Sequence, residues 1–102
     1  MMHANARELK APETLGLETR AAFRQLAEDV LEHLPQTTGV LVIDFLHTVK
    51  IDSAGLGALL LAQRKAAERG QGVVLRNLKD EFRFLLALTR LDDLFEIEPL
   101  PR

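Results

Sequence analysis

One serine stands in a context that favours phosphate chemistry. Ser53 lies in segment 51–57 (IDSAGLG), where a β-branched run gives way to a leucine-rich stretch that is expected to form a helix. The unpaired N–H groups and the dipole of a helix N-terminus favour an oxygen acceptor or a negative charge there, a phosphate included. Two interpretations of Ser53 follow: a phosphorylation site that switches binding, or the N-cap residue of its helix.

Two aspartates and a lysine accompany this serine. Asp52 immediately precedes Ser53, and Asp44 lies in the preceding extended run. The two carboxylates could position a phosphate-transferring partner or its metal, or they could end strands and cap turns. The structural role is our expectation for Asp44, whereas both roles stay open for Asp52, because an acid directly before a helix is favourable in either case. We expect Lys50 to extend its charge into solvent, with a binding role as the alternative.

The glycine and histidine patterns do not complete a nucleotide site or a metal site. Gly55 and Gly57 begin a dinucleotide fingerprint, but its third glycine would fall at Leu60, and no phosphate-binding G-x-x-x-x-G-K-[ST] run occurs. The three histidines have no metal-ligand spacing, and the absence of cysteine removes disulfides, thiolate metal sites and thiol catalysis. We therefore expect no metal and no cofactor.

A hydrolase centred on Ser53 is disfavoured. His47 could act as its base, and Asp44 could orient that histidine. However, Ile51 replaces the first glycine of the G-x-S-x-G nucleophile elbow, and a chain of 102 residues without a visible oxyanion loop has little room for a substrate cleft. We therefore do not expect this chain to be an enzyme.

The composition is that of one soluble globular domain. The 102 residues are 47% hydrophobic and 27% charged, which suffices for a buried core and differs from a disordered chain. Acidic and basic residues are mixed to a net charge of −2, without tryptophan or tyrosine, so we expect no nucleic-acid binding. The longest apolar run, residues 56–62, is far shorter than the ~20 residues that span a bilayer. Because the N-terminus has no apolar signal stretch, we expect a cytoplasmic protein.

Hydrophobic periodicity predicts a strand and a helix in the first third of the chain. Residues 7–11 fit a short edge strand, after a flexible arm of residues 1–6. An amphipathic helix is expected to begin at Thr14 or Thr19 and to end at Leu34. Its predicted apolar face comprises Phe23, Leu26, Ala27, Val30, Leu31 and Leu34.

A β-branched run and the leucine-rich stretch predict the centre of the fold. Residues 39–45 suit a central parallel strand, and residues 49–52 lead into a helix over 53–69. Gly70 follows that helix, as is typical of a helix C-terminus. The residues that this helix is expected to bury are Leu56, Leu59, Leu60, Gln63 and Ala67.

The remaining elements complete a mostly parallel sheet. A strand is expected over residues 72–77, a helix over 80–91, a last strand over 94–97 and a tail over 99–102. Strands that alternate with helices are typical of right-handed βαβ units. The predicted fold class is therefore α/β, with a mostly parallel sheet of four or five strands and helices in the crossovers.

Four segments carry a family resemblance. They are residues 42–44 (VID), 51–57, 70–75 and 82–97. Together they resemble the STAS family, the domain of bacterial anti-sigma factor antagonists. The likeness covers residues 7–98 and is most specific in the D-S-x-G-L run, whose distance from Asp44 also matches the family. The resemblance implies a STAS-like domain over these residues.

The resemblance also implies protein binding that phosphorylation controls. Such domains bind an anti-sigma factor that is also a serine kinase, and phosphorylation reverses the binding. Ser53 matches the phosphorylated serine and Asp52 the acid before it. The other positions expected to serve partner binding or the phosphate site are Asp44, Lys50, Ala54, Gly55 and Leu56. A phosphoserine phosphatase is a further expected partner, and a homodimer is possible because a second copy could cover an open sheet edge.

The sequence departs from the family pattern near the serine. Ala54 stands where the family often has a second serine, and His47, Thr48 and Lys50 replace small or apolar residues. The N-terminal part is short, so an edge strand common in the family could be present, reduced or missing. A second hypothesis therefore stands beside the first: a subunit that supports the ATPase of a bacterial ABC lipid-transport complex, as some small STAS proteins do.

Overall fold

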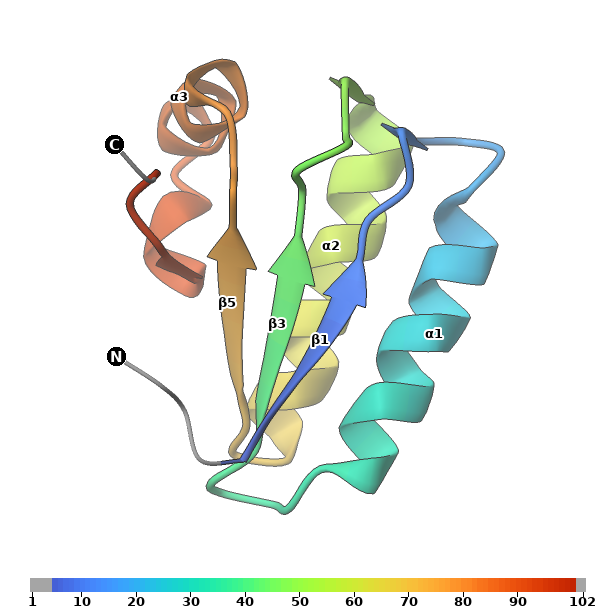
Figure 1. Ribbon diagram of the computed structural model, residues 1–102, viewed down its shortest axis with the longest axis vertical. Helices are drawn as coiled ribbons and strands as arrows, with labels where there is room; N and C mark the ends of the chain where they lie inside the picture. The colour runs from blue at the N-terminus through green and yellow to red at the C-terminus, as the bar shows by residue number, and fades with distance from the viewer. Residues whose placement is uncertain (1–4, 101–102) are drawn as a thin grey trace.

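A parallel sheet forms the centre of the molecule. The computed structural model describes residues 5–100. Its four-stranded sheet has the order β1-β3-β5-β6, and every neighbouring pair is parallel (Figure 1). The strands are β1 (Ala6–Lys10), β3 (Val40–Asp44), β5 (Gly72–Arg76) and β6 (Glu96–Ile97). The predicted edge strand is present as β1. Most of the expected N-terminal arm (residues 1–4) and the end of the tail (101–102) lie outside the described residues.

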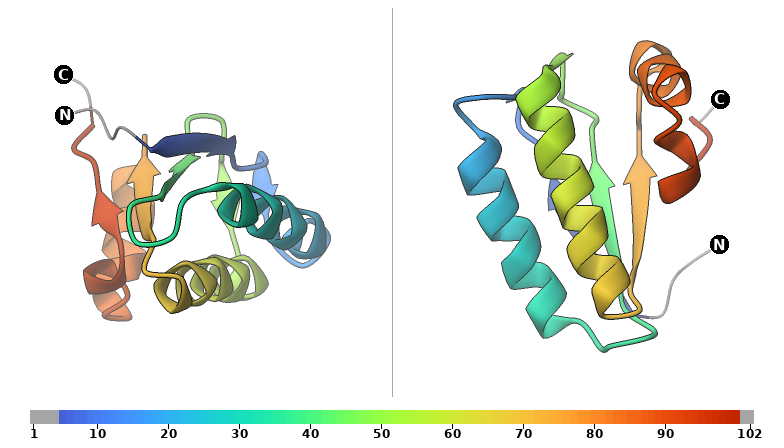
Figure 2. Two further views of the ribbon diagram at one scale, coloured as in Figure 1. Left: turned by 90° about the horizontal axis from the view of Figure 1, so that it is seen from below. Right: turned by 180° about the vertical axis from the view of Figure 1, so that it is seen from behind.

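The helices of the described chain are α1 (Arg20–His33), α2 (Ser53–Glu68), α3 (Asp80–Leu88) and the short 3₁₀ helix η1 (Asp92–Leu94). Helices α1 and α2 cover one face of the sheet, and α3 lies beyond the end of β5 (Figure 1, Figure 2). Each lies in a crossover between parallel strands, as βαβ units require. The predicted α/β class with a four-stranded parallel sheet is thus confirmed. None of the helices within residues 5–100 combines the length and the hydropathy needed to cross a bilayer.

A second, two-stranded ladder lies outside the main sheet. Here β2 (Thr14–Leu15) pairs in parallel with β4 (Lys50–Ile51). The Asp52 N–H extends this ladder by donating to the Leu15 carbonyl at 3.2 Å. Periodicity did not predict the ladder, and Thr14, one of two expected starts of the first helix, belongs to it. Its effect is to join the segment before α1 to the segment before α2.

The core lies between the sheet and helices α1 and α2. In α1 the predicted residues Phe23, Ala27 and Leu31 are buried, and Leu34 just beyond it is buried too. The predicted burial of Leu26 is wrong, because 51% of this residue is exposed. It lies one position from the buried stripe, on the side of α1 that faces solvent.

The predicted buried face of α2 is largely wrong. Leu59 is buried as expected, but Leu56, Leu60 and Gln63 are only half-buried and Ala67 is exposed. The buried positions are Gly55, Ala58, Leu59, Ala62 and Ala66. Because α2 packs directly beside α1 (Figure 2), small residues occupy the close contact and the larger leucines lie at its sides.

The ends of two elements also differ from expectation. Helix α3 ends at Leu88 and not at residue 91, because Arg90 adopts a left-handed conformation (φ 58°) and the Leu91 N–H bonds back to the Leu86 carbonyl. The last strand begins at Glu96, since η1 occupies the residues before it. The predicted glycine after α2 is confirmed, because Gly70 has φ +68°.

Candidate functional site

Ser53 is exposed and is the first residue of α2. The interpretation of Ser53 as the N-cap is wrong, because Asp52 occupies that position and its Oδ1 accepts a hydrogen bond from the Gly55 N–H at 2.9 Å. The cap is thus supplied by the neighbour, and the serine hydroxyl is not needed to complete the helix. Ser53 therefore presents its hydroxyl at the surface, beside a helix N-terminus.

The carboxylate of Asp52 connects α2 to the segment before α1. Its Oδ2 accepts a second hydrogen bond, from the Leu17 N–H at 3.2 Å. These bonds, from Gly55 first and Leu17 second, hold the pKa of Asp52 below its ordinary value of 3.8, against the opposing effect of desolvation. The N–H of Ala54 and the positive charge of Lys50 also lower the pKa of Asp52. Asp52 is therefore ionised at neutral pH, and its two hydrogen bonds hold the start of α2 against the segment before α1.

We expect Asp52→Asn to destabilise the protein in a pH-dependent way. Because the folded-state pKa is lowered, the carboxylate contributes stability above its ordinary pKa, and that contribution is lost as pH falls through the folded-state pKa. Urea unfolding of the two proteins should give a constant difference from pH 5 to pH 8 that shrinks in more acidic solution. A difference that grows towards acidic pH would contradict this role.

Two glycines bring the segment around Leu15 against the start of α2. A Cβ added to Gly55 would overlap the carbonyl oxygen of Leu15, and one added to Gly16 would overlap the Asp52 carboxylate. The expected site residue Gly55 thus serves as a contact point between two backbones. Gly16 was missed by sequence reasoning, because nothing in its local pattern shows that it faces Asp52 from a distant part of the chain.

Asp44 stabilises the loop that precedes β4. It is buried (8% exposed), and its Oδ1 accepts hydrogen bonds from the Leu46 N–H and from the Asn77 side-chain amide, both at 2.9 Å. Its carboxylate therefore joins the end of β3 to the segment between β5 and α3. This is the structural role expected for Asp44 from the residues alone.

We expect Asp44→Ala to cost about 1–3 kcal/mol of stability, because the Leu46 N–H and the Asn77 amide lose their acceptor in a partly buried place. Hydrogen exchange should then accelerate first in the Leu46 loop. Asp44→Asn is the matched control, since both bonds end on the same oxygen and the amide oxygen of asparagine can accept both. Equal stability of the alanine variant and the native protein would show that the two bonds contribute nothing.

The hydrolase arrangement is not formed. Within residues 5–100, His47 makes no hydrogen bond to Ser53 or to Asp44, whose Oδ1 is instead bonded to Leu46 and Asn77. His47 is exposed in the loop before β4. These three residues therefore do not assemble a nucleophile, a base and an orienting acid.

Three exposed apolar side chains lie in the loops joined to the segment that carries the serine. Leu17 is 64% exposed, Leu46 54% and Val49 58%, and all three lie in the loops that the β2–β4 ladder and the two aspartates support. Lys50 is exposed as predicted. We name the group Leu17, Leu46, Val49, Lys50 and Ser53 the Ser53 surface. Apolar groups held in fixed loops, with a polar residue beside them, are typical of protein-binding surfaces.

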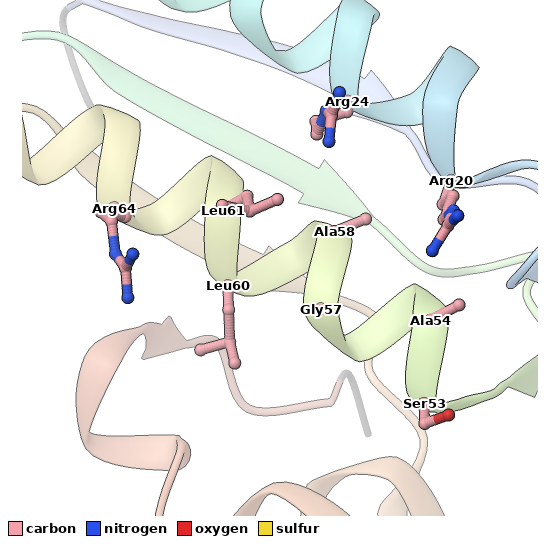
Figure 3. Close-up of a pocket in the computed structure, with 9 residues that line it drawn as sticks. All are labelled: Arg20, Arg24, Ser53, Ala54, Gly57, Ala58, Leu60, Leu61 and Arg64. Carbon is pink, nitrogen blue, oxygen red and sulfur yellow. The ribbon is translucent and has the colours of Figure 1, made fainter.

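The other expected site residues lie on α2, just behind the Ser53 surface. Leu56 is half-buried and packs against the core, and Ala54 is half-buried at the mouth of a cavity. This open cavity of about 430 Å³ lies between α1 and α2 (Figure 3). Its walls carry three arginines, Arg20, Arg24 and Arg64, which sequence reasoning missed. The spacing of two arginines by four residues at the start of α1 was the available signal.

The comparison with known families identifies the chain. A sequence model described as "Mlab, STAS domain" matches residues 4–98. The chain belongs to the STAS domain family. The resemblance seen in segments such as 51–57 is therefore confirmed.

Solved structures share the STAS fold with this chain. An anti-sigma factor antagonist from Mycobacterium paratuberculosis is 27% identical, with a TM-score of 0.73 over 97% of this chain and 81% of that one. The anti-sigma factor antagonist SpoIIAA in its unphosphorylated form is 13% identical, with a TM-score of 0.71 over 99% and 86%. A sulfate transporter family protein from Wolinella succinogenes is 17% identical, with a TM-score of 0.72 over 92% and 77%. The fold is thus shared by anti-sigma factor antagonists and by a sulfate transporter family protein, so the fold alone does not assign a function.

Proposed function

We propose that this STAS domain is an anti-sigma factor antagonist: a protein-binding module, not an enzyme, that binds an anti-sigma factor serine kinase and is switched off by phosphorylation of Ser53. The observation that carries the proposal is the exposed Ser53 at the first position of α2, with Asp52 supplying the cap in its place. The 27% identical antagonist from Mycobacterium paratuberculosis supports the same function. The solved SpoIIAA, described in its unphosphorylated form, supports phosphorylation as the switch.

The unmodified protein would dock through the Ser53 surface. Leu17, Leu46 and Val49 supply apolar area, and Lys50 supplies a charge at the rim. Asp44, Asp52 and Gly55 would act by positioning the loops that carry these side chains. Leu56, which packs against the core, would anchor the first turn of α2, and Ala54 lies half-buried in the same turn. Because hydrogen bonds from Asp44 and Asp52 hold these loops, we expect little backbone movement on binding.

Phosphorylation would change the interface and leave the fold intact. A phosphate adds about −1.5 to −2 charges at pH 7, directly beside the ionised Asp52. Inside the free domain, the N-terminus of α2 is favourable for this charge. In a complex, the same charge would be desolvated against apolar groups of the partner, which is costly. The modified domain should therefore stay folded and release its partner.

The test of this assignment is incubation of the full chain with the serine kinase of its own bacterium and ATP, followed by mass spectrometry. We expect one phosphate, on Ser53, and its removal by the phosphoserine phosphatase of the same pathway. Ser53→Ala should accept none, and Ala54, in place of the family's second serine, offers no alternative acceptor. Phosphate on another residue, or none at all, would count against the proposal.

A transporter subunit is the second candidate. Two findings favour it: the matching family is described as "Mlab, STAS domain", and a sulfate transporter family protein shares the fold. In this case the Ser53 surface would support the ATPase of a bacterial ABC lipid-transport complex without a phosphorylation switch. Capture of an ATP-binding cassette protein by both the native chain and Ser53→Asp would favour this candidate over the first.

A further inference from the structure

The cavity beside Ser53 holds positive charge that the described structure does not neutralise. Arg20 and Arg24 line it from α1, and Arg64 lines it from α2. Within residues 5–100, none of these three arginines forms an ion pair. An arginine cluster on a cavity wall is suited to oxyanions, because the guanidinium group donates paired hydrogen bonds to phosphate or carboxylate.

The positions of Arg20 and Arg24 are unfavourable for the helix that carries them. Both lie at the N-terminal end of α1, where the helix dipole is positive, and the first turn contains no acidic residue. The N-cap residue Thr19 makes no capping bond, because its hydroxyl instead donates to the Thr14 carbonyl at 2.7 Å. A bound anion would relieve this accumulation of positive charge.

The unbalanced charge belongs to the cavity that Ser53 lines. Further along, a second cavity between the same helices is lined by Glu28, Glu32 and Glu68 together with Lys65 and Arg69, so opposite charges are mixed there. The floor of the first cavity is open, since a Cβ added to Gly57 would meet no atom within 4 Å. Of the two cavities, only the one that Ser53 lines therefore combines open space with unbalanced positive charge.

We propose that Arg20, assisted by Arg24, binds the phosphoryl group that Ser53 carries after modification. Figure 3 shows Arg20 directed from α1 toward the first turn of α2, with Arg64 at the opposite end of the cavity. Arg64 follows Ser53 by eleven residues in the same helix, about 16 Å along its axis, so it lies too far away to take part. This inference rests on the proposed phosphorylation of Ser53 and describes what the phosphate contacts.

The consequence is a second effect of the same modification. A phosphate of about −1.5 to −2 charges would roughly neutralise Arg20 and Arg24 and would connect α1 to α2. A partner that places acidic groups near this cavity would lose its attraction at the same time as it meets the phosphate. Within residues 5–100 Asp52 forms no ion pair with Arg20, and its carboxylate accepts the Gly55 and Leu17 N–H groups instead.

The experiment is a ³¹P NMR titration of the full chain with phosphoserine incorporated at position 53 during synthesis, so that no kinase is needed. The second ionisation of phosphoserine has its midpoint near pH 6, and a contacting arginine lowers it. We expect Arg20→Gln to raise the midpoint by roughly half a pH unit or more relative to the native background. Arg24→Gln should raise it less, and Arg64→Gln, the matched control, should leave it unchanged.

The outcomes separate this inference from the proposed function. The proposed contact would be ruled out if the midpoint were the same in the native background and in Arg20→Gln. An equal shift in Arg64→Gln would also rule it out. Neither result depends on whether the phosphorylated chain binds a kinase, which is measured separately. Circular dichroism of each variant would verify that the exposed substitution leaves the fold unchanged.

Discussion

Replacing Gly55 with alanine should lower the free energy of unfolding by about 1–3 kcal/mol, although alanine is the better helix former. Gly55 is buried in the first turn of α2, and an added methyl group would overlap the backbone carbonyl of Leu15. A backbone cannot move aside as a flexible side chain can, so either α2 or the β2–β4 ladder must shift. Because Asp52 connects the same two segments, the shift would also displace the Ser53 surface.

The chain offers a matched control for this prediction. Gly57 lies two residues further along α2, where an added Cβ would meet no atom within 4 Å. There we expect alanine to stabilise the protein by about 0.5–1 kcal/mol, the ordinary helix preference. Urea unfolding of both variants measures the contrast. If Gly55→Ala were as stable as Gly57→Ala, the close approach of Leu15 to α2 would not exist in solution.

Much of the fold was predictable because its signals are local. The β-branched run around residues 40–44 and the capping and periodic signals around α2 depend on neighbours in the chain, and both elements form nearly where expected. The exposed position of Lys50 and the glycine after α2 were predictable for the same reason. The resemblance carried by segment 51–57 indicated the STAS family.

The predictions were wrong or incomplete where tertiary contacts determine which residues are buried or paired. The buried face of α2 is set by its close packing beside α1, so Ala58 and Ala62 are buried while the more hydrophobic Leu60 is only half-buried. The β2–β4 ladder joins residues far apart in sequence and is too short to leave a periodic pattern. The same holds for Gly16 and for the arginines of the cavity, whose meaning depends on what faces them.

If the proposed function is right, a charge at position 53 should weaken the complex with the anti-sigma factor kinase by about 100-fold or more. An uncompensated charge buried in an interface costs about 3–5 kcal/mol, and each 1.4 kcal/mol corresponds to a factor of ten. Ser53→Asp introduces such a charge, and Ser53→Ala removes only a hydroxyl that the helix cap does not use. The alanine variant should therefore bind as tightly as the native chain and should stay bound in the presence of ATP.

The decisive measurement is the dissociation constant of the complex with the proposed kinase partner, determined by calorimetry for the unmodified chain and for the chain phosphorylated at Ser53. We expect tight binding of the first and an affinity about 100-fold or more lower for the second, with both chains equally folded. Equal affinities would contradict this expectation, because the exposed hydroxyl of Ser53 would then lie outside the surface that the partner contacts.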